Sequence, residues 1–265
     1  RAGAWKSWAR QTGIQPFHGP LPAGAAPACI LLAVPESGIP AAALRLAGEL
    51  APSRRVRFAA HLSGLAGLES LGPLGRLGFR IAALHPLVPF GRPRASLEAL
   101  QGAPVTVLAG PGAARASARV VRLWGGRPWP LDPRLDRRRY HLGLVLAANH
   151  LAALLGWSEE LLRPAFGEHA GEMAARLAGE ALQGVRRTGA AEALTGPVVR
   201  GELAVLEAHF RSLRADERRR YAGLIEPVLD LARRSGRLSP GKAREIENLL
   251  AAWRSPGSSG GGKKP

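Results

Sequence analysis

Residues 29–35, Cys-Ile-Leu-Leu-Ala-Val-Pro, form a continuous apolar run that ends at a proline. Such a run is typical of a strand buried on both faces of a sheet. Similar runs recur through the first half of the chain, with helical patterns between them. The predicted strands are 29–34, 56–60, 79–84, 105–109 and 127–131, and the predicted helices are 41–50, 66–77 and 113–124. This alternation predicts an α/β layer with a mostly parallel sheet.

The second half of the chain contains no strand-like run. It starts with a long helical pattern, 137–156, which is apolar on much of its surface and is therefore expected to be central. Further helical patterns cover 171–189, 201–213, 216–234 and 240–253, with Asp216 and Ser239 as predicted N-caps. The domain boundary is expected near Asp132-Pro133. This gives a Rossmann-like unit at 1–131, a helical unit at 132–253 and a Ser/Gly-rich tail at 254–265 that we expect to be disordered.

The composition is that of a globular protein with a strong basic excess. Hydrophobic residues make up 46% and charged residues 22%, and the net charge of +17 ordinarily indicates a polyanionic partner. Only four of the 37 basic residues are lysines, however, and arginine is abundant together with alanine, glycine and proline, as in proteins of GC-rich genomes. The only tight arginine clusters, 137–139 and 218–220, lack interleaved aromatic residues and are interpreted as solvated helix faces. Nucleic-acid binding therefore ranks last among the functions considered.

The chain begins at Arg1, and its only methionine is Met173, which indicates a removed N-terminal segment or a fragment. Residues 1–10 contain no apolar core of a signal peptide, and no run of 18 apolar residues predicts a membrane span. The single cysteine, Cys29, provides no disulfide framework. We therefore expect a cytoplasmic protein without a membrane-spanning segment.

Polar and turn-forming residues follow three predicted strands at the point where each ends, and ligands of open α/β sheets bind at this edge. The segments are 34–37, 61–64 and 85–87. His61 and His85 occupy equivalent positions at two successive strand ends. Each could bind substrate, or could simply cap its strand or hydrogen-bond a loop. The seven histidines show no HExxH or Cys/His spacing, so no metal site is predicted.

Two segments of the second half also carry candidate residues. Tyr140, His141 and Asn149 lie on the long helix, and the last two are about 80° apart on the same side of an ideal helix. Asn149 could bind a substrate carbonyl or carboxylate, or could tie two helices together. After Gly196-Pro197 breaks a helix, Thr195 could cap the next helix and Arg200 could bind an anion, although an ordinary turn with an exposed arginine is an equal alternative.

These motifs, taken in order, resemble a bacterial family of Rossmann-like oxidoreductases. The matching segments are Leu-Leu-Ala-Val-Pro (31–35), His-Leu-Ser-Gly (61–64), Leu-His-Pro-Leu (84–87), Tyr-His…Ala-Asn (140–149) and Leu-Thr-Gly-Pro-Val-Val-Arg-Gly (194–201). Members carry a C-terminal helical domain of unknown function and are similar to pyrroline-5-carboxylate reductase and to 6-phosphogluconate and 3-hydroxyacid dehydrogenases. The resemblance implies a 6-phosphogluconate-dehydrogenase-like helical domain, NADP(H) as cofactor, and a homodimer formed through the helical domain.

The sequence departs from this family at its front. Members begin with a strand, a Gly-x-Gly-x-x-Gly turn and a helix, and the glycines let the pyrophosphate approach a helix N-terminus. No such motif occurs in the 265 residues, and residues 1–10 resemble the helix after the second strand. The comparison predicts a chain shortened by its first βαβ unit, of about 30 residues, that binds dinucleotide poorly or not at all.

A second departure concerns the proton donor. Many 3-hydroxyacid dehydrogenase relatives place a lysine four residues before the asparagine of the long helix, where this chain has Val145. Since histidine titrates near neutral pH, His141 or His85 is expected to act as the general acid. The remaining predicted roles are substrate binding by His61, Ser63, Gly64, Asn149, Thr195 and Arg200, and nicotinamide contact by Val34, Pro35, Glu36 and Pro86.

The sequence thus favours an NAD(P)H-dependent oxidoreductase that reduces a small carboxylated keto or imino compound. A non-catalytic dinucleotide-binding or scaffold protein of the same fold is the alternative. An arginine-rich nucleic-acid-binding protein is the third.

Overall fold

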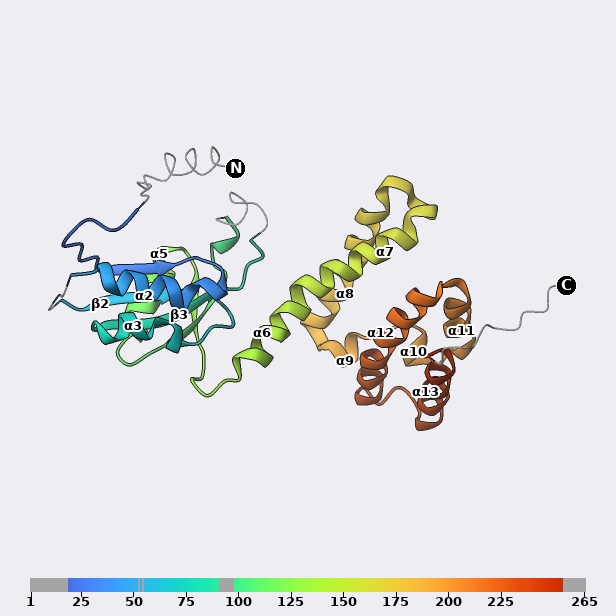
Figure 1. The fold of residues 1–265 in the computed structure, drawn as a ribbon. Helices are drawn as coiled ribbons and strands as arrows, with labels where there is room; N and C mark the ends of the chain where they lie inside the picture. Colours follow the sequence, from blue (N-terminus) through green and yellow to red (C-terminus); the bar gives the residue numbers. More distant parts are fainter. Residues whose placement is uncertain (1–18, 52, 54, 91–97, 255–265) are drawn as a thin grey trace. The chain divides into compact units, whose positions relative to one another are not determined.

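The computed structural model describes residues 19–51, 53, 55–90 and 98–254 (Figure 1). The chain divides into two compact units, Arg1–Leu151 and Ala152–Pro265, which are taken separately below. The predicted helix at residues 1–10 and the predicted disordered tail lie outside the described residues. The last strand ends at Pro130, while the division between the compact units falls later, within the following helical stretch.

The first unit is built on a five-stranded sheet in the order β1-β2-β3-β4-β5. The strands are β1 Cys29–Leu32, β2 Arg57–His61, β3 Phe79–Pro86, β4 Pro104–Ala109 and β5 Arg127–Pro130. Neighbours pair in parallel except β3 and β4, which are antiparallel. The prediction of a mostly parallel α/β sheet is therefore confirmed, and each predicted strand is present with shifts of one or two residues at its ends.

Alternate residues of the central strands point to opposite sides of the sheet, so the sheet has two apolar faces. Helices cover both of these faces. On one face, Ala59 and Phe79 belong to a core shared with α2 (Ile39–Glu49), the 3-10 helix Leu68–Leu71 and α3 (Gly72–Arg76). On the other face, Ala60 and Leu84 belong to a core shared with α5 (Ala114–Leu123). Two separate hydrophobic cores thus hold the sheet from either side.

The prediction that β1 is buried on both faces is wrong. Only Leu32 is buried, Cys29 is exposed, and Leu31 keeps 39% of its surface. Among the described strands β1 lies at the edge of the sheet and pairs with β2 alone. Leu32 joins the core beneath α2, whereas Leu31 points to the opposite face, where the core beneath α5 is built on β2, β3 and β4.

The second unit is all helical, as predicted. Its elements are α7 (Leu151–Phe166), the 3-10 helix Gly167–His169, α8 (Ala170–Thr188), α9 (Ala190–Ala193), α10 (Pro197–Arg200), α11 (Leu203–Ser212), α12 (Ala215–Arg234) and α13 (Pro240–Arg254). Its core is centred on Leu206, Phe210, Ile225 and Ile246. The Phe210 ring stacks on Trp253 with centroids 5.5 Å apart.

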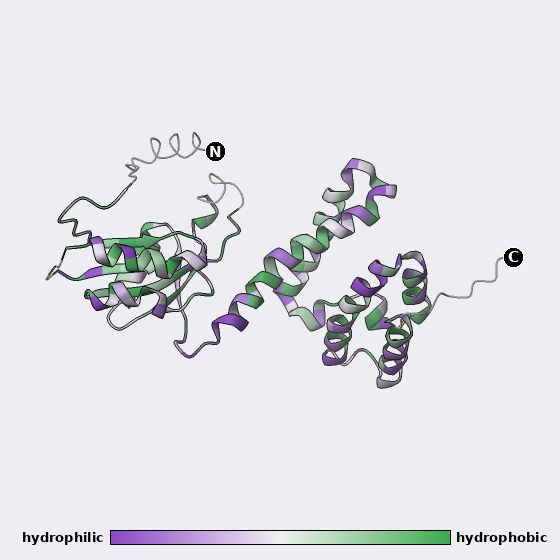
Figure 2. Ribbon diagram, viewed as in Figure 1, coloured by the Kyte–Doolittle hydropathy of each residue, from purple (hydrophilic) through white to green (hydrophobic). Residues whose placement is uncertain are grey.

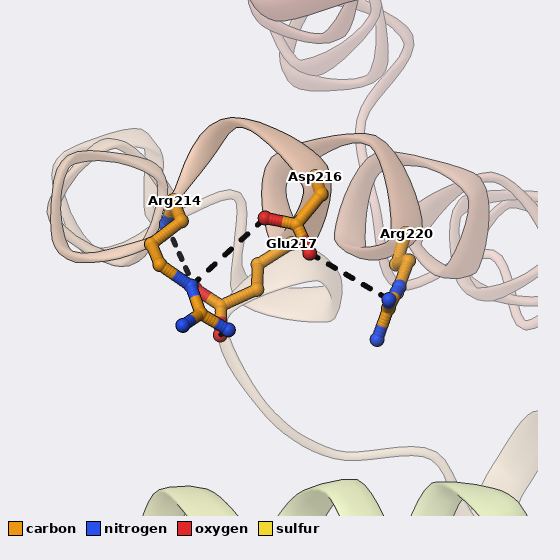
Figure 3. A network of polar contacts seen from close by, with 4 residues as sticks. All are labelled: Arg214, Asp216, Glu217 and Arg220. Atoms are coloured by element: carbon orange, nitrogen blue, oxygen red, sulfur yellow. Dashed lines mark hydrogen bonds and ion pairs between the residues drawn. The ribbon is translucent and has the colours of Figure 1, made fainter.

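The N-cap of helix α12 lies two residues before the predicted N-cap, Asp216. Arg214 is the N-cap, and the Glu217 carboxylate reaches back to accept a hydrogen bond from the Arg214 backbone N–H at 2.8 Å. Asp216 lies instead in the first turn, where its oxygens contact Arg214 and Arg220 (Figure 3). The predicted cap Ser239 is confirmed, since its Oγ accepts a hydrogen bond from Lys242 N at 3.3 Å.

The long helical stretch after residue 136 is exposed, so the prediction that it is central is wrong. Helix α6 (Arg137–Val145), a π-helical segment (Leu146–His150) and α7 contain no buried residue. Large apolar side chains here keep about half of their surface, among them Leu142 at 54%, Leu146 at 52% and Leu161 at 52%, and Figure 2 shows hydrophobic residues along this stretch. By length and composition alone, the helical stretch Arg137–Thr188 could also cross a membrane. The stretch contains no unbroken run of 18 apolar residues, because His141, Asn149 and His150 interrupt the leucines.

Candidate functional site

The candidate site lies in the first unit, where β1, β2 and β3 end. Because these three strands are parallel, their carboxyl ends meet at one edge of the sheet. Strand β4 runs the other way, so its first residues lie at the same edge, with Thr106 directly opposite His85. Helix α6 contributes Arg137, Tyr140 and His141 to this edge through the contacts described next.

Ser63 ties the loop after β2 to the loop after β1. Its hydroxyl donates to Glu36 Oε2 at 2.6 Å and accepts hydrogen bonds from the backbone N–H groups of Leu65 and Ala66, at 3.0 and 2.9 Å. A hydroxyl has one proton and two acceptor positions, so all of its capacity is used within the protein. The residues predicted to bind substrate and nicotinamide are therefore brought together here, but the Ser63 hydroxyl itself stabilises the loop.

His61 is fully buried and makes two hydrogen bonds within the same loop. Its Nδ1 accepts from Ser63 N at 3.3 Å, and its Nε2 lies 3.2 Å from the Gly67 carbonyl oxygen, which can only accept. The neutral ring therefore carries its proton on Nε2. Burial lowers the pKa of His61, which keeps the ring neutral. This geometry matches the structural alternative for His61, in which the ring holds the loop.

Arg137 fastens α6 to this loop. Its Nη2 donates to Gly64 O at 2.8 Å and Ser63 O at 3.2 Å, and its Nε donates to Leu65 O at 3.1 Å. The guanidinium is half-buried, and burial lowers its pKa. The interpretation of residues 137–139 as a solvated face is therefore wrong for Arg137. The helix start is set by Asp136, whose carboxylate accepts hydrogen bonds from the N–H groups of Arg138 and Arg139.

The second arginine cluster, 218–220, needs the same correction for one member. Arg218 Nε donates to Phe210 O at 2.9 Å, and its guanidinium lies 4.8 Å from the centre of the Trp253 ring. An arginine can bury its stem and planar head against an aromatic ring while satisfying its donors, so a run of arginines does not by itself indicate a solvated face.

Gly64 brings the two candidate acid–base residues together. A Cβ atom at this position would lie 2.9 Å from His85 Cε1 and 2.9 Å from His141 Cδ2. The two imidazole rings have centroids 6.4 Å apart and are tilted by 55°. A side chain at residue 64 would therefore displace both rings. The structure thus collects Gly64, His85 and His141, which lie on three different elements and were predicted separately.

His85 contacts two further residues that the sequence analysis did not assign to the site. Its Nδ1 lies 3.4 Å from Tyr140 Oη. Tyr140 Oη in turn lies 2.8 Å from Thr106 Oγ1. The Thr106 hydroxyl donates a hydrogen bond to the His85 carbonyl oxygen at 3.2 Å. The pKa of His85 is lowered, first by burial and then by the charges of His141 and Arg137. Only the Tyr-His dipeptide signalled Tyr140. No local signal marks Thr106, because its proximity arises from strand pairing.

The other predicted residues lie apart from this cluster or contact it differently. Pro86 is buried at the end of β3, and Val34 is 41% exposed after β1. Asn149 is exposed within the π-helical segment, a type of distortion that is frequent at functional sites. The binding roles of these three residues stay predictions.

Thr195 and Arg200 belong to the second unit. Arg200 makes a two-pronged contact with Glu202 at 2.8 and 2.9 Å, and both side chains are exposed. The predicted cap at Thr195 is wrong, since α10 begins with Gly196 as N-cap and without a side-chain cap. The positive φ of Gly196, 103°, gives the chain a sharp entry that a capping threonine would not adopt.

Comparison with known proteins supports this fold. Residues 103–226 match a family described as a domain of unknown function, DUF2520. A protein of Thermotoga maritima has a similar structure, with TM-score 0.60 and 19% identity over 79% of this chain and 81% of that one. A protein of Bacteroides fragilis, described as a “putative NADP oxidoreductase”, has TM-score 0.63 and 15% identity over 94% of this chain and 83% of that one. No curated protein matches the chain.

These matches confirm the resemblance drawn from the sequence motifs. The chain shares the fold of these two structures, a Rossmann-like α/β unit followed by a helical unit, and part of it matches the domain of unknown function.

Gly64→Ala tests the packing of the two histidine rings against the loop. The added Cβ overlaps both rings, so we expect the free energy of unfolding to fall by about 1–3 kcal/mol. The measurement is urea unfolding monitored by circular dichroism. The matched control is Gly48→Ala in α2, where an added Cβ meets nothing within 4 Å and should stabilise by about 0.5–1 kcal/mol. Equal stability of Gly64→Ala and the unmodified protein would contradict the packing described.

Proposed function

We propose that the protein is an NAD(P)H-dependent oxidoreductase that reduces a small carboxylated keto or imino compound. The observation that carries the proposal is the pair His85 and His141, packed against Gly64 at the carboxyl edge of the parallel strands. In open α/β sheets this edge binds the ligand. The NADP oxidoreductase description attached to the B. fragilis protein supports the same class of reaction.

The residues of this chain fit one end of a nicotinamide dinucleotide. Val34, Pro35, Glu36 and Pro86 follow or end β1 and β3, and would line the nicotinamide. A Gly-x-Gly-x-x-Gly turn, which would bind the pyrophosphate, does not occur in the 265 residues. When bound, the cofactor would supply the hydride. The residues of this chain would therefore contact the nicotinamide ring, whereas the sequence contains no motif for the pyrophosphate.

The chain's own residues would move the proton and orient the substrate. A carbonyl or imine that accepts a hydride needs a proton on its oxygen or nitrogen, and an imidazolium is a suitable donor near neutral pH. His141 or His85 supplies that proton in this proposal. Asn149, which belongs to the same unit as both histidines, would orient the substrate.

A titration with NADPH tests the proposal. We expect the full-length protein to bind NADPH and to oxidise it with members of a panel of keto and imino acids. His141→Ala should lower kcat about 10²- to 10⁴-fold and leave the Kd for NADPH unchanged. The control is His169→Ala, an exposed histidine of the second unit, which should change neither.

Each contrary outcome of this titration has a definite meaning. Failure to bind NADPH contradicts the proposal as a whole. Binding without turnover across the panel supports the alternative, a non-catalytic dinucleotide-binding or scaffold protein. Unchanged turnover in His141→Ala removes His141 from the reaction.

The direction of the His85 pKa shift predicts the pH dependence of the reaction. Burial lowers this pKa below the ordinary value of 6.5, so the ring is protonated only at pH values below that lowered pKa. If His85 is the acid, kcat/KM for reduction rises as pH falls through its pKa, whereas kcat/KM for the reverse oxidation is highest above it. Steady-state rates in both directions between about pH 5 and 8 measure this. A reduction rate that increases with pH would exclude His85 as the acid.

We also propose that the protein forms a homodimer through its helical unit. Apolar side chains on α7 and α8 keep a large part of their surface, among them Leu154, Leu161, Leu177 and Leu182, at 40–71%. Beside α7 lies an apolar cavity of about 490 Å³ that includes Leu154, Trp157 and Leu161. A second copy would cover these side chains with the same surface, since a two-fold interface is self-complementary. We also propose a cytoplasmic location. Cys29 is a free thiol, which is the form that a reducing compartment maintains.

Leu161→Glu tests the dimer. The carboxylate would have to be buried in the interface, so the mass measured by light scattering should fall from twice 28.0 kDa to 28.0 kDa. Leu44→Glu, at a 64% exposed position of α2, should leave the dimer intact. A monomeric unmodified protein, or one that inserts into lipid vesicles through this helical stretch, would contradict the proposal.

A further inference from the structure

Residues from three elements form a closed series of polar contacts at His85. His85 ends β3, Thr106 is its directly opposite neighbour on β4, and Tyr140 comes from α6. The His85 carbonyl, Thr106 Oγ1, Tyr140 Oη and His85 Nδ1 form a closed series of contacts at 3.2, 2.8 and 3.4 Å. The series starts and finishes on the same residue, so the positions of its protons are linked.

The number of protons in this series decides which way each hydrogen bond runs. A carbonyl oxygen can only accept, so Thr106 donates its one hydroxyl proton to His85 O. The oxygen of Thr106 must then accept at its 2.8 Å contact, so Tyr140 donates its one proton to Thr106. Tyr140 Oη has no second proton and accepts from His85. The neutral ring is therefore protonated at Nδ1 and has its lone pair on Nε2.

We propose that Tyr140 and Thr106 are positioning residues that hold neutral His85 as its Nδ1–H tautomer, and that Nε2 is the atom that exchanges a proton with the substrate. This inference rests on the proposed function for its second half. Gly64 packs against the same side of the ring, since a Cβ there would lie only 3.0 Å from Nδ1, so the ring is held close to the loop. Nε2 has no hydrogen-bond partner among the described residues.

The charged and titratable groups around the ring agree with this assignment. Arg137, Tyr140 and His141 face it from α6, and β4 presents the neutral hydroxyl of Thr106. Arg137 cannot accept a hydrogen bond, and Tyr140 Oη is the oxygen that lies within hydrogen-bond distance of Nδ1, so the Tyr140 oxygen is its acceptor.

His61, at the end of the adjacent strand, shows the opposite arrangement. There Nε2 donates to the Gly67 carbonyl and Nδ1 accepts from a backbone N–H, so both nitrogens are used. The two strand-end histidines thus differ in their tautomer and in whether a ring nitrogen is free of hydrogen bonds to the described residues. His61 holds its loop, and His85 keeps one basic nitrogen for a reaction.

The tautomer can be measured on the full chain without cofactor or substrate. The protein is labelled with ¹⁵N-histidine, and long-range ¹H–¹⁵N correlation spectra are recorded at a pH where the His85 ring is neutral, with His85→Gln as the assignment variant. We expect a protonated Nδ1 and an unprotonated Nε2 for His85. A protonated Nε2 in the neutral ring would overturn the proposal.

Thr106→Val tests whether the hydroxyl series sets the tautomer. Without the Thr106 oxygen, the Tyr140 proton turns to His85 Nδ1, and the ratio of the two tautomers should shift toward Nε2–H by about fivefold or more. Thr106→Ser keeps the hydroxyl and should keep the original ratio. An unchanged ratio in Thr106→Val would overturn the proposal. Should that variant fail to fold, Tyr140→Phe decides, since loss of the acceptor must lower the Nδ1–H fraction.

A matched control and a kinetic measurement separate this role from a structural one. Tyr221→Phe removes the partner of His209, 2.7 Å away in the second unit, and should leave the His85 signals unchanged. In turnover, Thr106→Val should lower kcat about tenfold or more with KM retained, and Thr106→Ser should restore it. Absence of any NADPH turnover would contradict the proposed function, whereas the tautomer measurement stands or falls without it.

Discussion

The site depends on the hydrogen bonds of Arg137. One guanidinium spans the carbonyl oxygens of three successive residues, 63–65, and so fixes both the loop after β2 and the start of α6. Because Tyr140 and His141 lie within the first turns of that helix, the same contact determines where their rings lie. An arginine suits this task, since its planar head offers several donors in fixed directions and remains charged when half-buried. Loss of these donors would leave loop carbonyls without partners and α6 free to shift.

The contacts divide the polar groups of the site into those that build it and those that are left for a ligand. The Ser63 hydroxyl and both nitrogens of His61 form hydrogen bonds within the protein, so these atoms are not available to bind a ligand. His85 and His141 remain, one of them with a pKa lowered by burial. Burial of one ring shifts its proton equilibrium, which is a common feature of residues in acid–base chemistry.

The sequence predicted the local features of this protein and missed the features that depend on distant contacts. Continuous apolar runs located all five strands, and polar residues at their ends located His61 and His85. The roles of Thr106 and Arg137 could not be predicted, because one follows from the antiparallel register of β3 and β4 and the other from contacts to residues more than 70 positions away. Burial of α7 also depends on distant contacts, so its apolar pattern predicted a buried helix but could not indicate which surface would pack against it. Competition between neighbours also matters, as at α12, where Glu217 caps the helix in place of Asp216.

Gly64 connects the constraint from Arg137 to the chemistry of the two histidines. Its carbonyl receives the shortest of the Arg137 hydrogen bonds, while its Cα faces the rings of His85 and His141 at a distance that excludes any side chain. Glycine at this position of the His-Leu-Ser-Gly segment therefore has a physical reason that is independent of the turn: only a residue without a side chain lets both rings pack this closely against the loop.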